Sequence, residues 1–184
     1  MKTWFTADLH FNHTNILKYT KRPWATVEEM NHGLVERWNS VVQPLDKVYI
    51  LGDVALGKKS DAVNWVKQLY GIKHLVFGNH DEGLRNNEDF LRCFEWAKDL
   101  AEIKVEGQHI VLCHFAMKVW HHSHHGSWNL HGHSHGTMPD DQTSLQLDVG
   151  VDAWDCYPVP FETLRSRMAL KSWQPVDHHN PKTT

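Results

Sequence analysis

Four short apolar runs, each followed at once by polar residues, constrain the fold of this chain more than any other feature. The runs cover residues 3–7, 48–51, 74–77 and 110–113. Runs of this length and composition are typical of buried strands. Polar side chains at their ends would project from a rigid sheet, which can hold them in a fixed geometry. The sequence therefore predicts a sheet whose strand ends carry a polar site.

Helical patterns alternate with these strands. A capping-box pattern at Thr26 and Glu29 opens a helix that is predicted to end at Val42. A second helix is predicted over residues 60–71, because glycine is a common helix end. Further elements are predicted as helices at 15–19, 86–94 and 161–168, a hairpin over 103–113 and a strand over 145–149.

Length and patterning favour one domain. A chain of 184 residues is large enough for a proper core and too small for a substantial second lobe. We predict a single domain over residues 1–173 and a disordered tail over 174–184, which shows no periodicity. No signal peptide is expected, and no apolar stretch approaches the roughly 20 residues that a membrane helix needs.

The net charge limits the binding partners that we expect, and the cysteine pattern indicates the cellular compartment. The formal net charge is −3, so no global basic field draws the chain to nucleic acid or anionic lipid. Sequence-specific nucleic-acid binding and a membrane partner are therefore not expected. Cys93, Cys113 and Cys156 are odd in number and lack a C-x-x-C pairing, which favours a reducing cytoplasm as the location.

Five polar motifs carry the chemistry. They are D-x-H at 8–10, G-D at 52–53, G-N-H-D at 78–81, the single His114, and G-H-x-H at 132–135. Carboxylates supply anionic oxygens that can bridge two cations, while imidazole nitrogens and an amide oxygen complete the coordination without more negative charge. Such a mixed donor set suits Mn, Fe, Co, Ni or Zn better than Mg or Ca. Asp8 and His10 are two residues apart, as are His133 and His135, so each pair would share one face of an extended strand.

In this order the motifs resemble those of the calcineurin-like metallophosphoesterases, over residues 8–135. The resemblance implies an α/β fold, a four-layer α-β-β-α sandwich with two mixed central sheets. It also implies two divalent transition-metal ions, with Mn expected first and Ni, Fe, Co or Zn as alternatives. Asp8, His10 and His135 would hold one ion, Asn79, His114 and His133 would hold the other, and Asp53 would bridge them.

The resemblance also implies a mechanism. Two cations about 3.5–4 Å apart would lower the pKa of a bridging water, and the resulting hydroxide would be the nucleophile. His80 is the histidine of the G-N-H-D motif that the family does not use as a ligand, so it is the candidate general acid. Such an acid contributes about 10²- to 10⁴-fold in rate. Asp81 would orient His80 or support the turn.

One departure from the family pattern bears on the substrate. The protein-phosphatase branch carries G-D-x-x-D-R-G, in which the second Asp orients the catalytic histidine and the Arg binds phosphate, and residues 52–58 lack both. The difference favours the small bacterial or phage-type phosphodiesterases of the superfamily. Arg22, in a loop after the first motif, is the candidate phosphate contact. Asn12 and His13 follow the D-x-H motif closely enough to contact substrate.

A histidine-rich segment lies between His114 and the G-H-x-H motif. It contains His121, His122, His124 and His125. The implied fold would place this segment at the rim of the metal site, where Trp120 or Trp128 could stack on a base. A solvated polar loop without a role in the site is the equally open alternative.

The sequence leaves three possible functions open. The first is a dinuclear-metal phosphodiesterase that acts on a nucleotide or similar small diester. The second is a phosphomonoesterase or pyrophosphohydrolase with the same metals. The third is a noncatalytic metal-binding scaffold for a partner protein, and the presence of all the ligand positions and His80 counts against it. A small phosphate ester is thus the expected partner, and the oligomeric state is left open.

Overall fold

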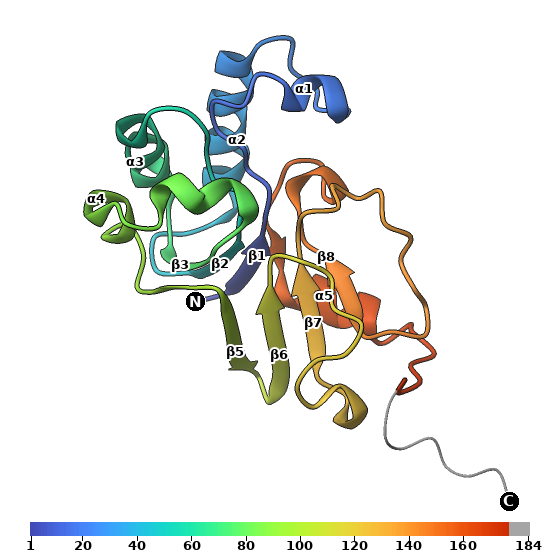
Figure 1. The fold of residues 1–184 in the computed structure, drawn as a ribbon. Helices are drawn as coiled ribbons and strands as arrows, with labels where there is room; N and C mark the ends of the chain where they lie inside the picture. The colour runs from blue at the N-terminus through green and yellow to red at the C-terminus, as the bar shows by residue number, and fades with distance from the viewer. Residues whose placement is uncertain (177–184) are drawn as a thin grey trace, which may run out of the picture.

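The computed structural model describes residues 1–176, which build two mixed β-sheets (Figure 1). The first sheet has the strand order β4-β3-β2-β1-β9, in which β9 runs antiparallel to β1 and the other neighbours are parallel. Its strands are β1 (Thr3–Thr6), β2 (Lys47–Leu51), β3 (Ile72–Val76), β4 (Ala97–Lys98) and β9 (Val159–Pro160).

The second sheet has the order β5-β6-β7-β8. Its strands are β5 (Leu100–Val105), β6 (Gln108–Cys113), β7 (Trp128–His131) and β8 (Gln146–Asp148). The hairpin predicted over 103–113 is confirmed by the antiparallel pairing of β5 with β6, whereas β7 and β8 continue the sheet in parallel. The predicted mixed α/β architecture with two mixed sheets is therefore confirmed.

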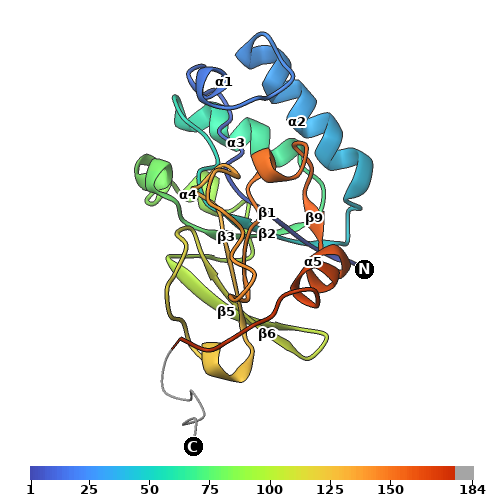
Figure 2. The ribbon, with the colours of Figure 1, turned by 90° about the vertical axis from the view of Figure 1, so that its right-hand side faces the viewer.

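Helices cover the outer face of the first sheet, and the second sheet packs on its other face (Figure 2). They are α1 (Ile16–Tyr19), α2 (Val27–Val41), α3 (Lys59–Gln68) and α4 (Glu88–Leu91), with the 3₁₀ turn η1 (Asn79–Leu84) between the last two. The capping box of α2 is confirmed, since Thr26 Oγ1 accepts from Glu29 N at 3.2 Å and the Glu29 carboxylate accepts from Thr26 N at 3.3 Å. The helix predicted over 86–94 is shorter, because only α4 lies within it.

Two hydrophobic cores hold these layers together. The first, with Phe11, Trp38 and Phe90 among its buried side chains, lies between the helices and the first sheet. The second lies between the two sheets, and α5 (Phe161–Met168) packs on it, with the Phe161 ring 5.6 Å from that of Trp128. Burial of this apolar area is the main term that stabilises the sandwich.

Loops complete the second sheet. Segment 115–127, which contains the one-turn helix η2 (Ser123–His125), is fixed at Met117, whose N donates to Asn129 Oδ1 and whose O accepts from Gln146 Nε2. A further turn, η3 (Val151–Ala153), follows β8. In residues 1–176 none of the helices is long and apolar enough to cross a membrane.

The predicted tail is only partly described. Gln174 N donates to Thr143 O at 2.9 Å, which attaches the start of this segment to the loop before β8. Residues 177–184 lie outside the described residues, so the prediction of disorder is not addressed there.

Candidate metal centre

The ends of five strands converge at one edge of the sandwich. Asp8 and His10 follow β1, Asp53 follows β2, Asn79 follows β3, His114 follows β6, and His133 and His135 follow β7. The parallel strands place their carboxyl ends at the same edge of each sheet, and the two sheets bring these edges together. All seven side chains predicted as ligands therefore meet at this site.

The seven side chains form two adjoining groups. Asp8, His10 and His135 offer ligand atoms within 4.8 Å of one another, as do Asp53, His114 and His133. Asp53 Oδ2 lies 3.5 Å from His10 Nε2 and 3.5 Å from His114 Nε2, so this oxygen stands between the two groups. Asn79 Oδ1 lies 3.0 Å from His114 Nε2 and 3.1 Å from His133 Nδ1, which places it in the second group.

The donor atoms of the site suit divalent metal ions. His10 Nε2 is buried and has no hydrogen-bond partner among the described residues, which is costly unless a further group satisfies it. His114 Nδ1 donates to Leu51 O at 2.7 Å, and His135 Nδ1 donates to Asp152 Oδ2 at 2.7 Å. With each Nδ1 held in this way, Nε2 is the atom that can offer a lone pair to a metal ion, the arrangement that orients histidine ligands.

Burial and charge set the protonation of the site. Burial raises the pKa of Asp8 to about 7, although the charges of His135 and His114 oppose it. Burial also lowers the pKa of His10 to about 2, so that imidazole is neutral as a ligand must be. For Asp53, burial acts upward, but the hydrogen bond and charge of His114 outweigh it and lower the pKa to about 2.

The ligand loops have an unusual backbone. Asp8, His10, Asp53, His133 and His135 all have positive φ, between 49° and 66°. The prediction that the D-x-H and G-H-x-H pairs lie on extended strands was therefore wrong. The strands stop before these residues, and loops with left-handed residues bring Asp8 with His10, and His133 with His135, to the same site. Such residues are strained, and they persist where the surroundings hold them.

Glycines in the motifs allow the loops to approach one another. A Cβ at Gly78 would lie 2.2 Å from Asp53 Oδ1, and a Cβ at Gly132 would lie 2.4 Å from the Cβ of Ala7. Neither position can accept a side chain without moving a ligand loop. The glycines of the motifs are thus part of the site's geometry.

Comparison with known proteins agrees with this geometry. The profile of the calcineurin-like phosphoesterase family matches residues 1–181. The chain belongs to this family. An uncharacterized protein of Methanocaldococcus jannaschii is 31% identical over 170 residues, which cover 89% of each chain. The gene 66 protein of Mycobacterium phage L5 is 33% identical over 181 residues, covering 83% of this chain and 87% of the phage protein.

A solved structure supports the fold. A protein of unknown function from Aquifex aeolicus superposes with a TM-score of 0.68 over 90% of this chain and 98% of its own, at 20% identity. Family membership makes the chain a phosphoester hydrolase of a class that uses divalent metals.

The phosphoesterase has an open cleft above the metal groups, with a volume of about 690 Å³. His13 and His80 line it, with ring centroids 5.7 Å apart. His80 N donates to Asp53 Oδ1 at 2.9 Å, so the backbone of His80 is tied to the Asp53 carboxylate while its exposed ring faces the cleft. His13 Nδ1 lies 3.3 Å from His10 Nδ1.

Asp81 holds the ligand loops in place. It is fully buried and accepts from Gly78 N at 2.8 Å and from Asp53 N and Val54 N at 2.9 Å each. Burial raises the pKa of this carboxyl group. Of the two roles left open by the sequence, these bonds match support of the turn.

The prediction that Arg22 contacts phosphate is corrected by the structure. Its side chain has no exposed surface, and its guanidinium donates to both Asp152 oxygens, to Asp8 O at 2.7 Å and to Leu9 O at 2.8 Å. Asp152, which sequence reasoning missed, thereby joins Arg22 to His135, a candidate ligand. In the sequence, the only sign of a role for Asp152 was its position after the strand predicted over 145–149. Burial acts to raise the pKa of Asp152, but these two partners lower it to about 2.

Asn12 has a structural contact with the helical layer, and its contact with substrate stays a prediction. Its Oδ1 accepts from Asn31 Nδ2 at 2.7 Å and from Trp65 Nε1 at 3.1 Å. Both partners belong to helices on the outer face of the first sheet, α2 and α3. Asn12 therefore fixes the D-x-H loop to the helical layer.

The histidine-rich segment lies at the opposite edge of the second sheet from the metal groups. Its His122 ring is 5.9 Å from that of His109, and Gln108 Nε2 donates to Gly126 O at 2.9 Å, so the segment packs at the start of β6. In Figure 1 the turn η2 lies below the start of β7, and the arrows of β6 and β7 point upward, away from it. The expected position at the rim of the site was wrong, because parallel β6 and β7 require a connection that returns to the starting edge.

The two tryptophans of this region are not available to stack on a base. Trp120 is buried and its Nε1 donates to Ser127 O at 3.1 Å. Trp128 is buried against Phe161. Both are part of the core between the sheets.

Proposed function

We propose that this phosphoesterase is a two-metal phosphodiesterase that acts on a nucleotide or a similar small diester. The observation that carries the proposal is the position of Asp53 Oδ2, 3.5 Å from a histidine of each group. One oxygen so placed can serve two ions. Asp8, His10 and His135 would hold the first ion and Asn79, His114 and His133 the second.

The metal ions and the side chains would have separate roles in the reaction. Two bound cations, Mn first and Ni, Fe, Co or Zn as alternatives, would acidify a water and neutralise phosphoryl oxygens. The His80 ring, free to face the cleft, would donate a proton to the leaving oxygen. His13 lies beside it and would contact the substrate. Asp81 would act as a positioning residue, through the backbone of the ligand loops.

The volume of the cleft is large enough for a diester. Its volume of about 690 Å³ lies within the range of about 300–1,000 Å³ typical of sites that hold whole organic ligands. A diester can extend organic groups on both sides of the phosphorus. The three cysteines are free thiols, which supports a reducing cytoplasm as the location.

The test compares a chromogenic phosphodiester with the matching monoester, on metal-stripped protein reconstituted with Mn, Ni or Zn. We expect faster diester turnover that a chelator abolishes. The variant His80→Gln should lower kcat by about 10²- to 10⁴-fold and leave the metal content unchanged. The matched control His109→Gln changes an exposed histidine at the far edge and should keep full activity.

Two results would count against the proposal. A preference for the monoester would make phosphomonoesterase activity the better assignment. Unchanged turnover in His80→Gln would remove the general-acid role of His80.

A further inference from the structure

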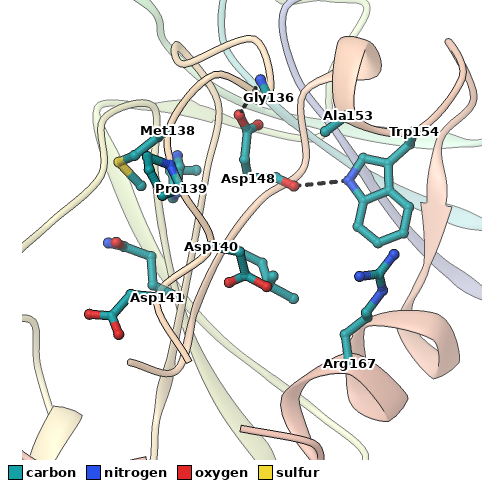
Figure 3. Close-up of a pocket in the computed structure, with 12 residues that line it drawn as sticks. Gly136, Met138, Pro139, Asp140, Asp141, Asp148, Ala153, Trp154 and Arg167 are labelled. Carbon is teal, nitrogen blue, oxygen red and sulfur yellow. Dashed lines mark hydrogen bonds between the residues drawn. The ribbon is translucent and has the colours of Figure 1, made fainter. Parts of the chain in front are cut away.

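A second cavity, of about 150 Å³, adjoins the metal cleft (Figure 3). The ends of β7 and β8 form its floor with His131, Gln146 and Asp148, and its walls are loop 136–141, η3 and Arg167 of α5. Met138 lines both this cavity and the metal cleft. The two spaces are therefore neighbours on either side of the loop that follows the G-H-x-H motif.

The volume of the cavity limits what it can hold. The volume of this cavity is half that of the smallest ordinary ligand pocket. A single ring system fits this space, whereas a whole nucleotide does not. The cavity is thus suited to one part of a ligand whose remainder lies in the larger cleft.

The floor of the cavity offers hydrogen-bond acceptors. His131 Nδ1 donates to Gly132 O at 2.9 Å, and the residue is fully buried beneath the floor. Each Asp148 oxygen accepts one backbone N–H, from Gly150 at 2.7 Å and from Gly136 at 2.9 Å, and keeps further lone pairs. A group that donates hydrogen bonds would satisfy this floor.

The opposite wall of the cavity carries the indole ring of Trp154 and the guanidinium of Arg167. Trp154 Nε1 donates to Asp148 O at 2.9 Å, which fixes the indole beside the cavity (Figure 3). Arg167 Cζ lies 5.6 Å from the indole centroid. Within residues 1–176 its guanidinium makes no hydrogen bond or ion pair, so its donors are available to a ligand. Asp140, in contrast, is already paired with Lys171.

We infer that this cavity binds an amino-bearing nucleobase of the substrate, that is adenine, guanine or cytosine. The exocyclic amine donates to the floor at Asp148, the ring nitrogens or carbonyl accept from Arg167, and the ring stacks near Trp154. The phosphate then lies in the metal cleft. This inference rests on the proposed function, whose substrate class it makes specific.

The first test uses nucleosides without phosphate and metal-free protein, so that the metal site contributes nothing to binding. Ligand-observed NMR and calorimetry should show binding of adenosine, guanosine or cytidine, with uridine at least about tenfold weaker because it lacks the amine that satisfies the acceptors. The variant Trp154→Leu should weaken binding about tenfold, the effect of removing one base-stacking ring.

A matched pair of variants on α5 gives a second test that does not depend on the folding of Trp154→Leu. Arg167→Ala should weaken nucleoside binding, and Arg165→Ala should not, because Arg165 pairs with Glu106 away from the cavity. In the metal-loaded enzyme, Arg167→Ala should raise KM for a nucleotide diester and leave kcat unchanged.

The outcomes separate this inference from the proposed function. Hydrolysis of the chromogenic diester without nucleoside binding overturns the base pocket and leaves the phosphodiesterase standing. Nucleoside binding without hydrolysis of any ester keeps the pocket and overturns the enzyme. Equal binding of uridine, or of free ribose, overturns the base assignment in favour of a sugar site.

Discussion

Replacement of Arg22 by methionine distinguishes a structural guanidinium from a phosphate contact. Methionine keeps most of the length of the side chain but removes the charge and all donors. The change leaves the Asp152 carboxylate, which is 6% exposed, without its cation, and it leaves the carbonyls of Asp8 and Leu9 without their donors. We therefore expect Arg22→Met to destabilise the fold.

The expected loss of stability follows from the burial of the ion pair between Arg22 and Asp152. Removing one partner of a buried ion pair costs about 3–5 kcal/mol, and we expect about 4 kcal/mol here. That is a large fraction of the roughly 5–15 kcal/mol by which a domain is stable. With a urea m-value of about 2 kcal/mol per molar, the unfolding midpoint should fall by about 2 M.

The assay is urea unfolding of metal-free protein at pH 7, followed by circular dichroism. Arg92→Met is the control, because Arg92 is 72% exposed and pairs only with exposed carboxylates, so its midpoint should barely move. The double variant Arg22→Met/Asp152→Asn should lose less than the sum of the two single variants. A midpoint shift below about 0.5 M, together with a raised KM for substrate, would refute the structural role.

Three further predictions address the loops, the pH dependence and the histidine-rich segment. Gly78→Ala should lower the metal content, since its Cβ would lie 2.2 Å from Asp53 Oδ1, whereas Gly83→Ala meets no atom within 4 Å and should bind metal normally in the same elemental assay. Burial acts to raise the pKa of Asp46, but hydrogen bonds from Lys2 N, Trp4 Nε1 and Gln43 N outweigh it and lower the pKa. The ionised form therefore stabilises the fold above about pH 4, and this contribution is lost as the pH falls through the lowered pKa. Asp46→Asn should thus be less stable than wild type near neutral pH, and urea midpoints should converge in acid; a constant difference at every pH would contradict this. The double variant His121→Ala/His122→Ala should keep wild-type kcat/KM, and a loss beyond about threefold would return this segment to the site.

Much of the fold was predictable because local signals agree with it. The apolar runs before the motifs become β1, β2, β3 and β6, and the capping box opens α2 at the predicted residue. Four of the five motifs follow these strands, so a polar site at the strand ends was also predictable.

The errors have physical reasons that no local pattern reveals. The partner of Arg22 is 130 residues away, so the pairing that buries its guanidinium leaves no trace near it in the sequence. β7 is only four residues long and wholly buried, so neither length nor alternation marks it as a strand. Because β7 was missed, the return of segment 115–127 to the starting edge of the sheet was missed as well.

The left-handed ligand loops have a consequence for how the protein takes up metal. Each such residue stores about 1–3 kcal/mol of conformational cost, and the cost is met by the surrounding structure when the chain folds. An ion then meets donors that are already in place and need little reorganisation. This cost makes the folded protein less stable than its core alone would make it. Because the cost is met before an ion binds, the binding free energy for metal is more favourable by a similar amount. Metal uptake should accordingly be fast, should change the backbone little, and should raise the melting temperature in proportion to the logarithm of the metal concentration.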